Sequence, residues 1–388
     1  MKASLARTLL GAALLACASA AFAQVKVGFL GTLTGPSGDT GRDQLDGFTL
    51  ALEQLGGKLG GVPATVVKED DQQKAEVALS AVGKLIERDK VDVITGLSFA
   101  NVLVALQAKI AATDVPFVGS VAGPSVLAGA QCKPNLFVTS WQSDAPAEVV
   151  GKYLSDKGTK RISTLTPNFV GGRDKVAGLK RFYKGEIVEE MYTPLNQLDF
   201  SAELTKIAAA KPEAVYAFYP GGLGVTFVRQ YQQSGLLGKI PLYTSNTIEG
   251  AGLDAMGAAA VGAVVGDTWT TGQPGEETRR FVEAYRKKYN RPPSPYAAFS
   301  YDAAMLLDAA IRSLDGKVGD RKALTKAIAG ASFKSLRGPF RFGANNFPVQ
   351  SYHIYQVAST AGKPELKLLQ TDVLKSHADA YISQCPLR

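Results

Sequence analysis

The chain is poor in the residues that bind metals and catalyse reactions. Its 388 residues include only two histidines, His353 and His377, and three cysteines. No HExxH or CxxC motif occurs, and no cluster of aspartate and glutamate has the spacing of a metal site. The phosphate-binding pattern GxxxxGK(S/T) is absent, and residues 221–224 lack the third glycine of a dinucleotide-binding loop. We therefore expect neither a metal nor an organic cofactor.

Concentrated charge is also missing. The chain has 43 Lys and Arg against 35 Asp and Glu, a net charge of +8, without any basic block or interleaved aromatic run. A nucleic-acid-binding protein needs a concentrated basic face, so we expect no nucleic-acid partner. Apolar residues make up 46% and charged residues 20%, which is typical of a globular protein large enough for two cores.

Residues 1–23 have the pattern of a secretory signal peptide. A short basic start precedes a stretch of Leu and Ala, and Ala21-Phe22-Ala23 forms a cleavage site before Gln24. This apolar stretch is too short to span a bilayer as a helix. The residues ending at Cys17 loosely resemble a lipoprotein box, but the cleavage site is the cleaner signal. We expect export and cleavage without a lipid anchor, and no membrane span in the mature chain.

Cleavage would leave two cysteines, Cys132 and Cys385. An even number of cysteines in an exported chain favours a disulfide, which would tie the C-terminal tail to the body of the protein. The alternative is a pair of buried thiols.

From residue 25 onward, short β-branched runs alternate with amphipathic segments. The first half predicts strands at 25–31, 62–69, 91–95 and 117–120, with helices at 41–55, 73–88 and 101–112. The second half predicts strands at 161–166, 186–192, 214–219, 241–244 and 261–265, with helices at 174–182, 202–210 and 223–233. Strands alternating with helices indicate an α/β fold with two doubly wound parallel sheets.

The predicted strand ends of the first half are rich in Gly, Ser and Thr, at residues 31–38, 95–101 and 119–125. Small molecules bind beyond the carboxyl ends of parallel strands, and the free N–H groups at the start of the next helix favour anions. Each loop taken alone is better explained as an ordinary capping turn. Three of them in successive units of one sheet converge on the same edge, which favours an anion site there.

One motif is reminiscent of an enzyme. Residues 96–100, Gly-Leu-Ser-Phe-Ala, nearly match the G-x-S-x-G nucleophile elbow, with Ser98 as nucleophile. However, His353 falls in an alternating run at 351–357 that predicts a strand, whereas such hydrolases place their histidine on a loop. A secreted serine hydrolase is therefore only a distant alternative, and we expect no catalytic residue.

Several short segments share a pattern that occurs together in one family, at 28–36, 46–48, 70–73, 93–96, 227–230, 234–236 and 301–304. On these segments, the chain from residue 25 to its end resembles the type I periplasmic solute-binding proteins of ABC importers, the leucine/isoleucine/valine-binding family. The resemblance implies two lobes that are joined by a three-crossover hinge and close on a ligand. Lobe one would comprise 24–141 plus 270–348, and lobe two 142–269 plus 349–388 with the C-terminal tail. The implied partner is an inner-membrane ABC permease, and the protein would be a periplasmic monomer. A ligand-sensing subunit of a membrane receptor has the same fold and stays open.

The resemblance also indicates where a ligand binds. In the amino-acid binders of this family, a hydroxyl and backbone N–H groups hold the ligand carboxylate, at turns that match Ala100-Asn101 and Ser120-Val121-Ala122. A carboxylate from lobe two holds the ligand ammonium, and the matching position here is Asn246. A buried ammonium without an anion is costly, so an amino acid loses support as ligand. Glu249, three residues on, could replace the missing acid, which keeps branched-chain amino acids as the alternative.

Three further stretches, 136–144, 167–174 and 337–348, resemble the subgroup that takes up aromatic carboxylates of the benzoate or phenylacrylate type. Trp141 and Phe169 would then stack on the ligand ring. Hinge or lobe packing explains Trp141 equally well and is the less favoured alternative for Phe169. Tyr219 would be a third wall residue, and Asn246 would contact a para substituent. Thr40 completes the predicted site.

Overall fold

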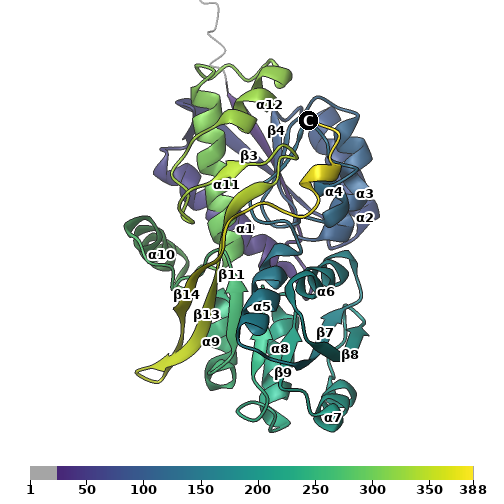
Figure 1. Ribbon diagram of the computed structural model, residues 1–388. Helices are drawn as coiled ribbons and strands as arrows, with labels where there is room; N and C mark the ends of the chain where they lie inside the picture. Colours follow the sequence, from purple (N-terminus) through teal and green to yellow (C-terminus); the bar gives the residue numbers. More distant parts are fainter. Residues whose placement is uncertain (1–23, 388) are drawn as a thin grey trace, which may run out of the picture.

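The computed structural model describes residues 24–387, which fold into two α/β lobes (Figure 1). The expected signal peptide and Cys17 lie outside the described residues. Within residues 24–387, no helix is long and apolar enough to cross a membrane.

Lobe one is built on a six-stranded sheet with the order β2-β3-β1-β4-β5-β6. All neighbouring strands are parallel except β2, which pairs with β3 as an antiparallel edge. The strands are β1 (Val25–Gly31), β2 (Lys58–Leu59), β3 (Val62–Asp70), β4 (Val93–Gly96), β5 (Phe117–Gly119) and β6 (Leu136–Val138). The helices of this half are α1 (Gly38–Gln54), α2 (Ala75–Gly83) with the π-helical turn η1 (Lys84–Arg88), α3 (Ala100–Ala111) and α4 (Ser125–Ala128).

Lobe two contains an eight-stranded sheet. Its parallel part has the order β11-β10-β9-β7-β8, and β13 adds antiparallel to β11, with β12 and β14 paired to β13. The strands are β7 (Arg161–Pro167), β8 (Glu186–Thr193), β9 (Ala214–Ala217), β10 (Leu242–Thr244), β11 (Val264–Asp267), β12 (Arg341–Phe342), β13 (Pro348–Thr360) and β14 (Lys363–His377). The helices from α5 to α9 are α5 (Ala145–Asp156), α6 (Val170–Phe182), α7 (Ser201–Ala210), α8 (Gly222–Gln233) and α9 (Gly250–Met256) with η2 (Gly257–Ala260).

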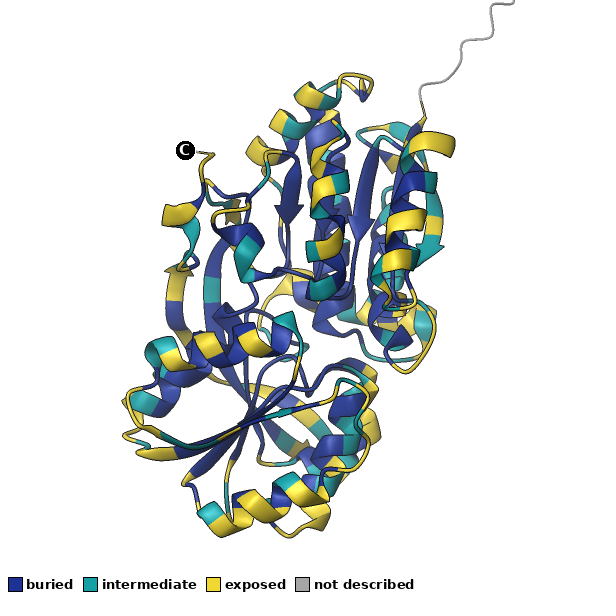
Figure 2. Cartoon of the chain, turned by 90° about the vertical axis from the view of Figure 1, so that its right-hand side faces the viewer, coloured by how far each residue is buried: buried dark blue, intermediate teal, exposed yellow. Residues whose placement is uncertain are grey.

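The last helices complete the lobes and the hinge. They are α10 (Glu276–Tyr289), α11 (Pro295–Arg312), α12 (Arg321–Gly330) and the short η3 (Ile382–Gln384). Helix α11 packs along α1 in lobe one, next to α12. The chain therefore passes between the sheets after β6, after β11 and before β13, which are the three crossovers. Figure 2 shows that buried residues lie in the inner strands of both sheets and on the inner helix faces, and that exposed residues lie on the outer helix faces and at the sheet edges.

A buried ion pair joins the crossovers. The Arg337 guanidinium bonds to Asp302 on α11, to the carbonyl of Ser140 just after β6, and to Gln350 in β13. Its side chain is only 1% exposed. An unpaired charge at this depth would be very costly, so this network holds α11, the segment after β6 and β13 together.

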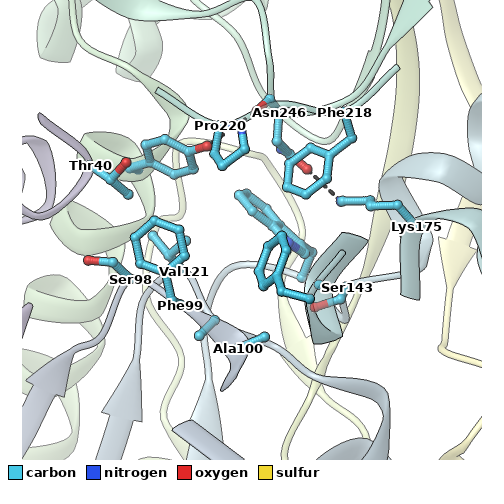
Figure 3. A pocket seen from close by; sticks show the side chains of 15 residues that line it. Thr40, Ser98, Phe99, Ala100, Val121, Ser143, Lys175, Phe218, Pro220 and Asn246 are labelled. Carbon is cyan, nitrogen blue, oxygen red and sulfur yellow. Dashed lines mark hydrogen bonds between the residues drawn. The ribbon is translucent and has the colours of Figure 1, made fainter. Parts of the chain in front are cut away.

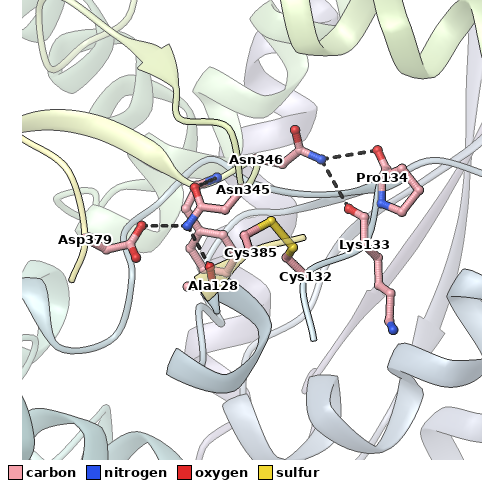
Figure 4. Close-up of a disulfide and its surroundings, with 9 residues drawn as sticks. Ala128, Cys132, Lys133, Pro134, Asn345, Asn346, Asp379 and Cys385 are labelled. Atoms are coloured by element: carbon pink, nitrogen blue, oxygen red, sulfur yellow. Dashed lines mark hydrogen bonds between the residues drawn. A yellow bond between two sulfur atoms is a disulfide. The ribbon is translucent and has the colours of Figure 1, made fainter. Parts of the chain in front are cut away.

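The C-terminal tail returns to lobe one. Cys385 forms a disulfide with Cys132, which lies between α4 and β6, with the Cα atoms 5.7 Å apart (Figure 4). Asp379 and the carbonyl of Ala128 both accept hydrogen bonds from the Asn345 side-chain amide. The tail after β14 therefore lies against lobe one, whereas the expected division grouped it with lobe two. The remaining lobe boundaries stay a prediction.

Candidate functional site

A cavity of about 440 Å³, counting the part that opens to solvent, lies between the lobes (Figure 3). It is formed where the parallel strands of both sheets end, as expected for an open α/β fold. Lobe one contributes the loops after β4 and β5 and the start of α1. Lobe two contributes the start of α6 and the loops after β9 and β10. The lining residues are Thr40, Ser98, Phe99, Ala100, Val121, Ala122, Trp141, Ser143, Phe169, Gly171, Lys175, Phe218, Pro220, Asn246 and Tyr296.

Aromatic rings form most of the wall. The ring centres of Phe99 in lobe one and Phe169 in lobe two are 6.2 Å apart. Phe169 stacks on Phe218 with the same distance between ring centres. The ring centre of Trp141 lies 6.2 Å from that of Tyr296, in the first turn of α11. These spacings are within the range of favourable aromatic pairs, so the walls are well suited to a flat apolar ligand.

The lobe-one end of the cavity carries hydrogen-bond donors. The Ser98 hydroxyl oxygen accepts bonds from the N–H of Thr32 at 3.2 Å and from the Gln44 amide at 2.8 Å. Because both acceptor positions are used, the hydroxyl hydrogen remains for a ligand. Ala100 begins α3, whose first N–H groups have no intrahelical partner. The Thr40 hydroxyl is buried without a hydrogen-bond partner among the described residues. This end therefore suits an anion.

The lobe-two end carries one cation. Lys175, on α6, is only 2% exposed, and its ammonium donates to Asn246 Oδ1 at 2.6 Å. Asn246 in turn donates from Nδ2 to Asp267 at 2.8 Å. The ammonium also lies 5.5 Å from the ring centre of Trp141 and 5.4 Å from that of Phe218. Burial lowers the pKa of Lys175, and the carboxylate of Asp267 opposes this effect.

Two hydrogen bonds between Asp174 and Ser125 join the lobes beside the cavity, and we call this pair the latch. On α6, Asp174 accepts hydrogen bonds from the N–H of Ser125 at 3.0 Å and from its hydroxyl at 2.7 Å. Ser125 begins α4 in lobe one, so Asp174 occupies the start of that helix and leaves it closed to a ligand. Burial raises the pKa of Asp174 to about 6.

Six of the nine predicted ligand residues line the cavity: Thr40, Ala100, Ala122, Trp141, Phe169 and Asn246. The N–H of Ala122 is already used, because it donates to the carbonyl of Leu97.

The other three predicted residues do not line the cavity. The Ser120 hydroxyl donates to Gln44 Oε1 at 3.1 Å, so Ser120 orients Gln44 behind the wall. Asn101 lies in the first turn of α3, with a buried side-chain oxygen that has no partner among the described residues. Tyr219 is fully buried in the lobe-two core, where its hydroxyl lies 3.0 Å from that of Thr193.

Two lining residues, Lys175 and Phe218, were not predicted from the sequence. Phe218 lies one residue beyond the strand end at Ala217 and faces the cavity, while its neighbour Tyr219 faces the core, as alternating side chains do. A signal for Lys175 existed: it follows Gly171 by four residues and precedes Leu179 by four, on the buried stripe of α6. A lysine on such a stripe is unusual and points to a specific role.

Two alternatives from the sequence can be placed as well. Glu249 faces a second, polar cavity between the lobes and does not line the cavity that contains Asn246; burial raises its pKa well above the usual value. Neither histidine contacts Ser98: His353 accepts from the N–H of Asp372, and His377 bonds to Glu148. Ser98 thus has no neighbouring base in the described residues, as a serine nucleophile requires.

Comparison with known proteins places the chain in a family. Residues 24–363 match the family model described as "Periplasmic binding protein". A solute-binding protein of an ABC transporter from R. palustris, solved with benzoate, is 31% identical and superposes with a TM-score of 0.87 over 92% of this chain and 99% of that one. A second, from Rhodopseudomonas palustris BisB5, was solved with 3,4-dihydroxybenzoic acid; it is 27% identical, with the same TM-score and coverage. The Leu/Ile/Val-binding protein homolog 6 of Brucella melitensis biotype 1 is 28% identical over 83% of this chain and 84% of its own length. The chain belongs to the periplasmic binding protein family, with the two-lobed type I fold.

Proposed function

We propose that this protein captures a small aromatic carboxylate of the benzoate type between its lobes and delivers it to an ABC permease in the inner membrane. Binding would shift an equilibrium between open and closed lobes toward the closed form. The aromatic walls would cover the ring, and the donors at Ser98 and at the start of α3 would receive the carboxylate.

The observation that carries this proposal is the ammonium of Lys175 beside Asn246. A zwitterionic amino acid bound by its carboxylate in lobe one would direct its own ammonium toward lobe two. Two ammonium groups about 4 Å apart repel by about 4 kcal/mol at an effective dielectric constant of about 20. A benzoate has no cationic group and avoids this cost. The ligands named for the two R. palustris proteins support the same conclusion.

Branched-chain amino acids are the second candidate. The name of the Brucella relative favours them, and the lobe-one end of the cavity would accept the carboxylate of either ligand class. The two candidates differ only at the lobe-two end.

Calorimetry and thermal unfolding with benzoate and with leucine would test the proposal. A ligand at about 100 times its dissociation constant should stabilise the protein by about 2.7 kcal/mol. We expect benzoate to do so and leucine to have no effect. Ser98→Ala should weaken benzoate binding, and ester panels should show no turnover by the wild type. Tight binding of leucine with no response to any aromatic acid would refute the ligand class and leave only the family.

The proposal includes the periplasm as the site of action, reached by export and removal of residues 1–23, with the protein monomeric and Cys17 not acylated. Cell fractionation, the mass of the mature N-terminus and size-exclusion chromatography with light scattering would check these points.

A further inference from the structure

The cavity has a second polar end that a benzoate would leave unused. Ser98 and Ala100 lie at the lobe-one side, whereas Lys175 and Asn246 lie at the lobe-two side, with aromatic rings between them (Figure 3). A ring carrying only a carboxylate would satisfy one end. The polar groups of the other end would then face the apolar edge of the ligand.

Lys175 has donors to spare at this end. An ammonium has three N–H groups, and one of them donates to Asn246 Oδ1. The surrounding faces of Trp141 and Phe218 stabilise the charge but accept no conventional hydrogen bond. Asn246 itself is held on both sides, by Lys175 and by Asp267. The group that remains open to a ligand is therefore the lysine and not the asparagine.

The charges around Lys175 decide which ligand group fits. Asn246 bridges the Lys175 ammonium to the buried carboxylate of Asp267. A second full carboxylate on the ligand would be placed near this acid and repelled by it. A hydroxyl group accepts a hydrogen bond from an ammonium without bringing a full negative charge.

We propose that Lys175 binds a hydroxyl group at the para position of the ligand ring, so that the protein prefers a 4-hydroxybenzoate-type acid over benzoate. This inference rests on the proposed function, because it assumes that the carboxylate binds at the lobe-one end. Lys175 is then a specificity-determining residue, and Asn246 and Asp267 are positioning residues that orient its ammonium.

The test is a cycle of two ligands and two proteins. Calorimetry measures the dissociation constants of benzoate and 4-hydroxybenzoate for the wild type and for Lys175→Met. We expect the wild type to favour 4-hydroxybenzoate by roughly tenfold to a hundredfold, the usual worth of one hydrogen bond to a charged group. Lys175→Met should abolish this preference, so that the ratio of the two dissociation constants falls to about one. Lys180→Met is the matched control, because Lys180 lies on the same helix, pairs with Glu190 at the surface and is half-exposed; it should behave as the wild type.

Other outcomes are equally informative. Equal affinity of the wild type for both ligands would overturn the inference. An equal loss of both ligands in Lys175→Met would also overturn it, since it would mean that Lys175 holds the carboxylate itself. If neither aromatic acid binds the wild type, the proposed function fails as well. Should Lys175→Met not fold because Asp267 is left unpaired, the double variant Lys175→Met/Asp267→Asn provides the same comparison.

Discussion

Replacing Ser125 by alanine should weaken ligand binding without touching the cavity. Ser125 does not line the cavity, but its hydroxyl donates to Asp174 of the other lobe at 2.7 Å, and its N–H donates to the same carboxylate at 3.0 Å. Opening the lobes must break both bonds. The Ser125→Ala variant loses the hydroxyl bond and keeps the N–H bond, so it destabilises the closed form selectively.

The size of the effect follows from the kind of bond removed. A hydrogen bond to a charged partner contributes about 1.5–3 kcal/mol. If ligand binding requires closure, the whole amount appears as a loss of affinity, roughly tenfold to a hundredfold in the dissociation constant. Calorimetry with benzoate measures this loss, and small-angle scattering measures how far the unliganded variant is open.

Ser155→Ala is the matched control for this experiment. Its hydroxyl donates to the carbonyl of Phe182 at 3.0 Å, and both residues belong to the same lobe. Removing it should lower the melting temperature and leave the dissociation constant unchanged. If Ser125→Ala behaves in the same way, the latch plays no part in closure and the reasoning is wrong.

Three further predictions concern pH, the disulfide and the lobe-two end of the cavity. Burial raises the pKa of Asp174 from 3.8 to about 6 in the closed form, so closure takes up a proton. The stabilisation of the closed form by protonated Asp174 is full below about pH 4 and is lost as the pH rises through about 6. Over this window, the free energy of benzoate binding should therefore weaken by at most about 3 kcal/mol more in the wild type than in Asp174→Asn, because the titration of benzoate itself is the same for both proteins. The unreduced protein should have a mass about 2 Da below that of the dithiol, and the double variant Cys132→Ser/Cys385→Ser should lose on the order of 5 kcal/mol of unfolding free energy, because the bridge closes a loop with a sequence separation of 253. Asn246→Asp should weaken benzoate binding by about 2.8 kcal/mol, the repulsion of two charges about 6 Å apart at an effective dielectric constant of about 20. The variant should not bind leucine unless Lys175 is replaced too. Leucine binding by the single variant would contradict this.

The regular elements were predictable because their patterns are local. The buried run at 25–31 coincides with β1, and the helix expected at 202–210 begins one residue earlier as α7. The helix expected at 174–182 begins at Val170 instead, with Phe169 as its N-cap. The polar and glycine-rich start of this helix hid the first turn, since glycine has low helix propensity. The helix also contacts α3 of the other lobe, and no local sequence pattern encodes such a contact.

The site was predictable only in outline. Loops at strand ends and the family resemblance located the cavity and placed Trp141 and Phe169 in its wall. Successive side chains at the end of β9 point to opposite sides, so Phe218 faces the cavity and Tyr219 faces the core. An error of one residue in the sequence prediction therefore selects the core residue in place of the cavity residue. Lys175 was missed because its environment is made by residues distant in sequence, namely Trp141, Phe218 and Asn246.

The course of the chain has a mechanical consequence. The first described strand, β1, belongs to lobe one, and the disulfide at Cys385 brings the other end of the chain back to the same lobe (Figure 1, Figure 4). Lobe two is thus built from two internal segments of the chain, β7–β11 and β13–β14, and contains neither terminal segment of the described residues. A fluorophore, an affinity tag or a surface tether attached at either end would ride on lobe one and leave lobe two free to swing. The molecule can therefore be immobilised through either end without loading the hinge, and a label on lobe two would then report closure.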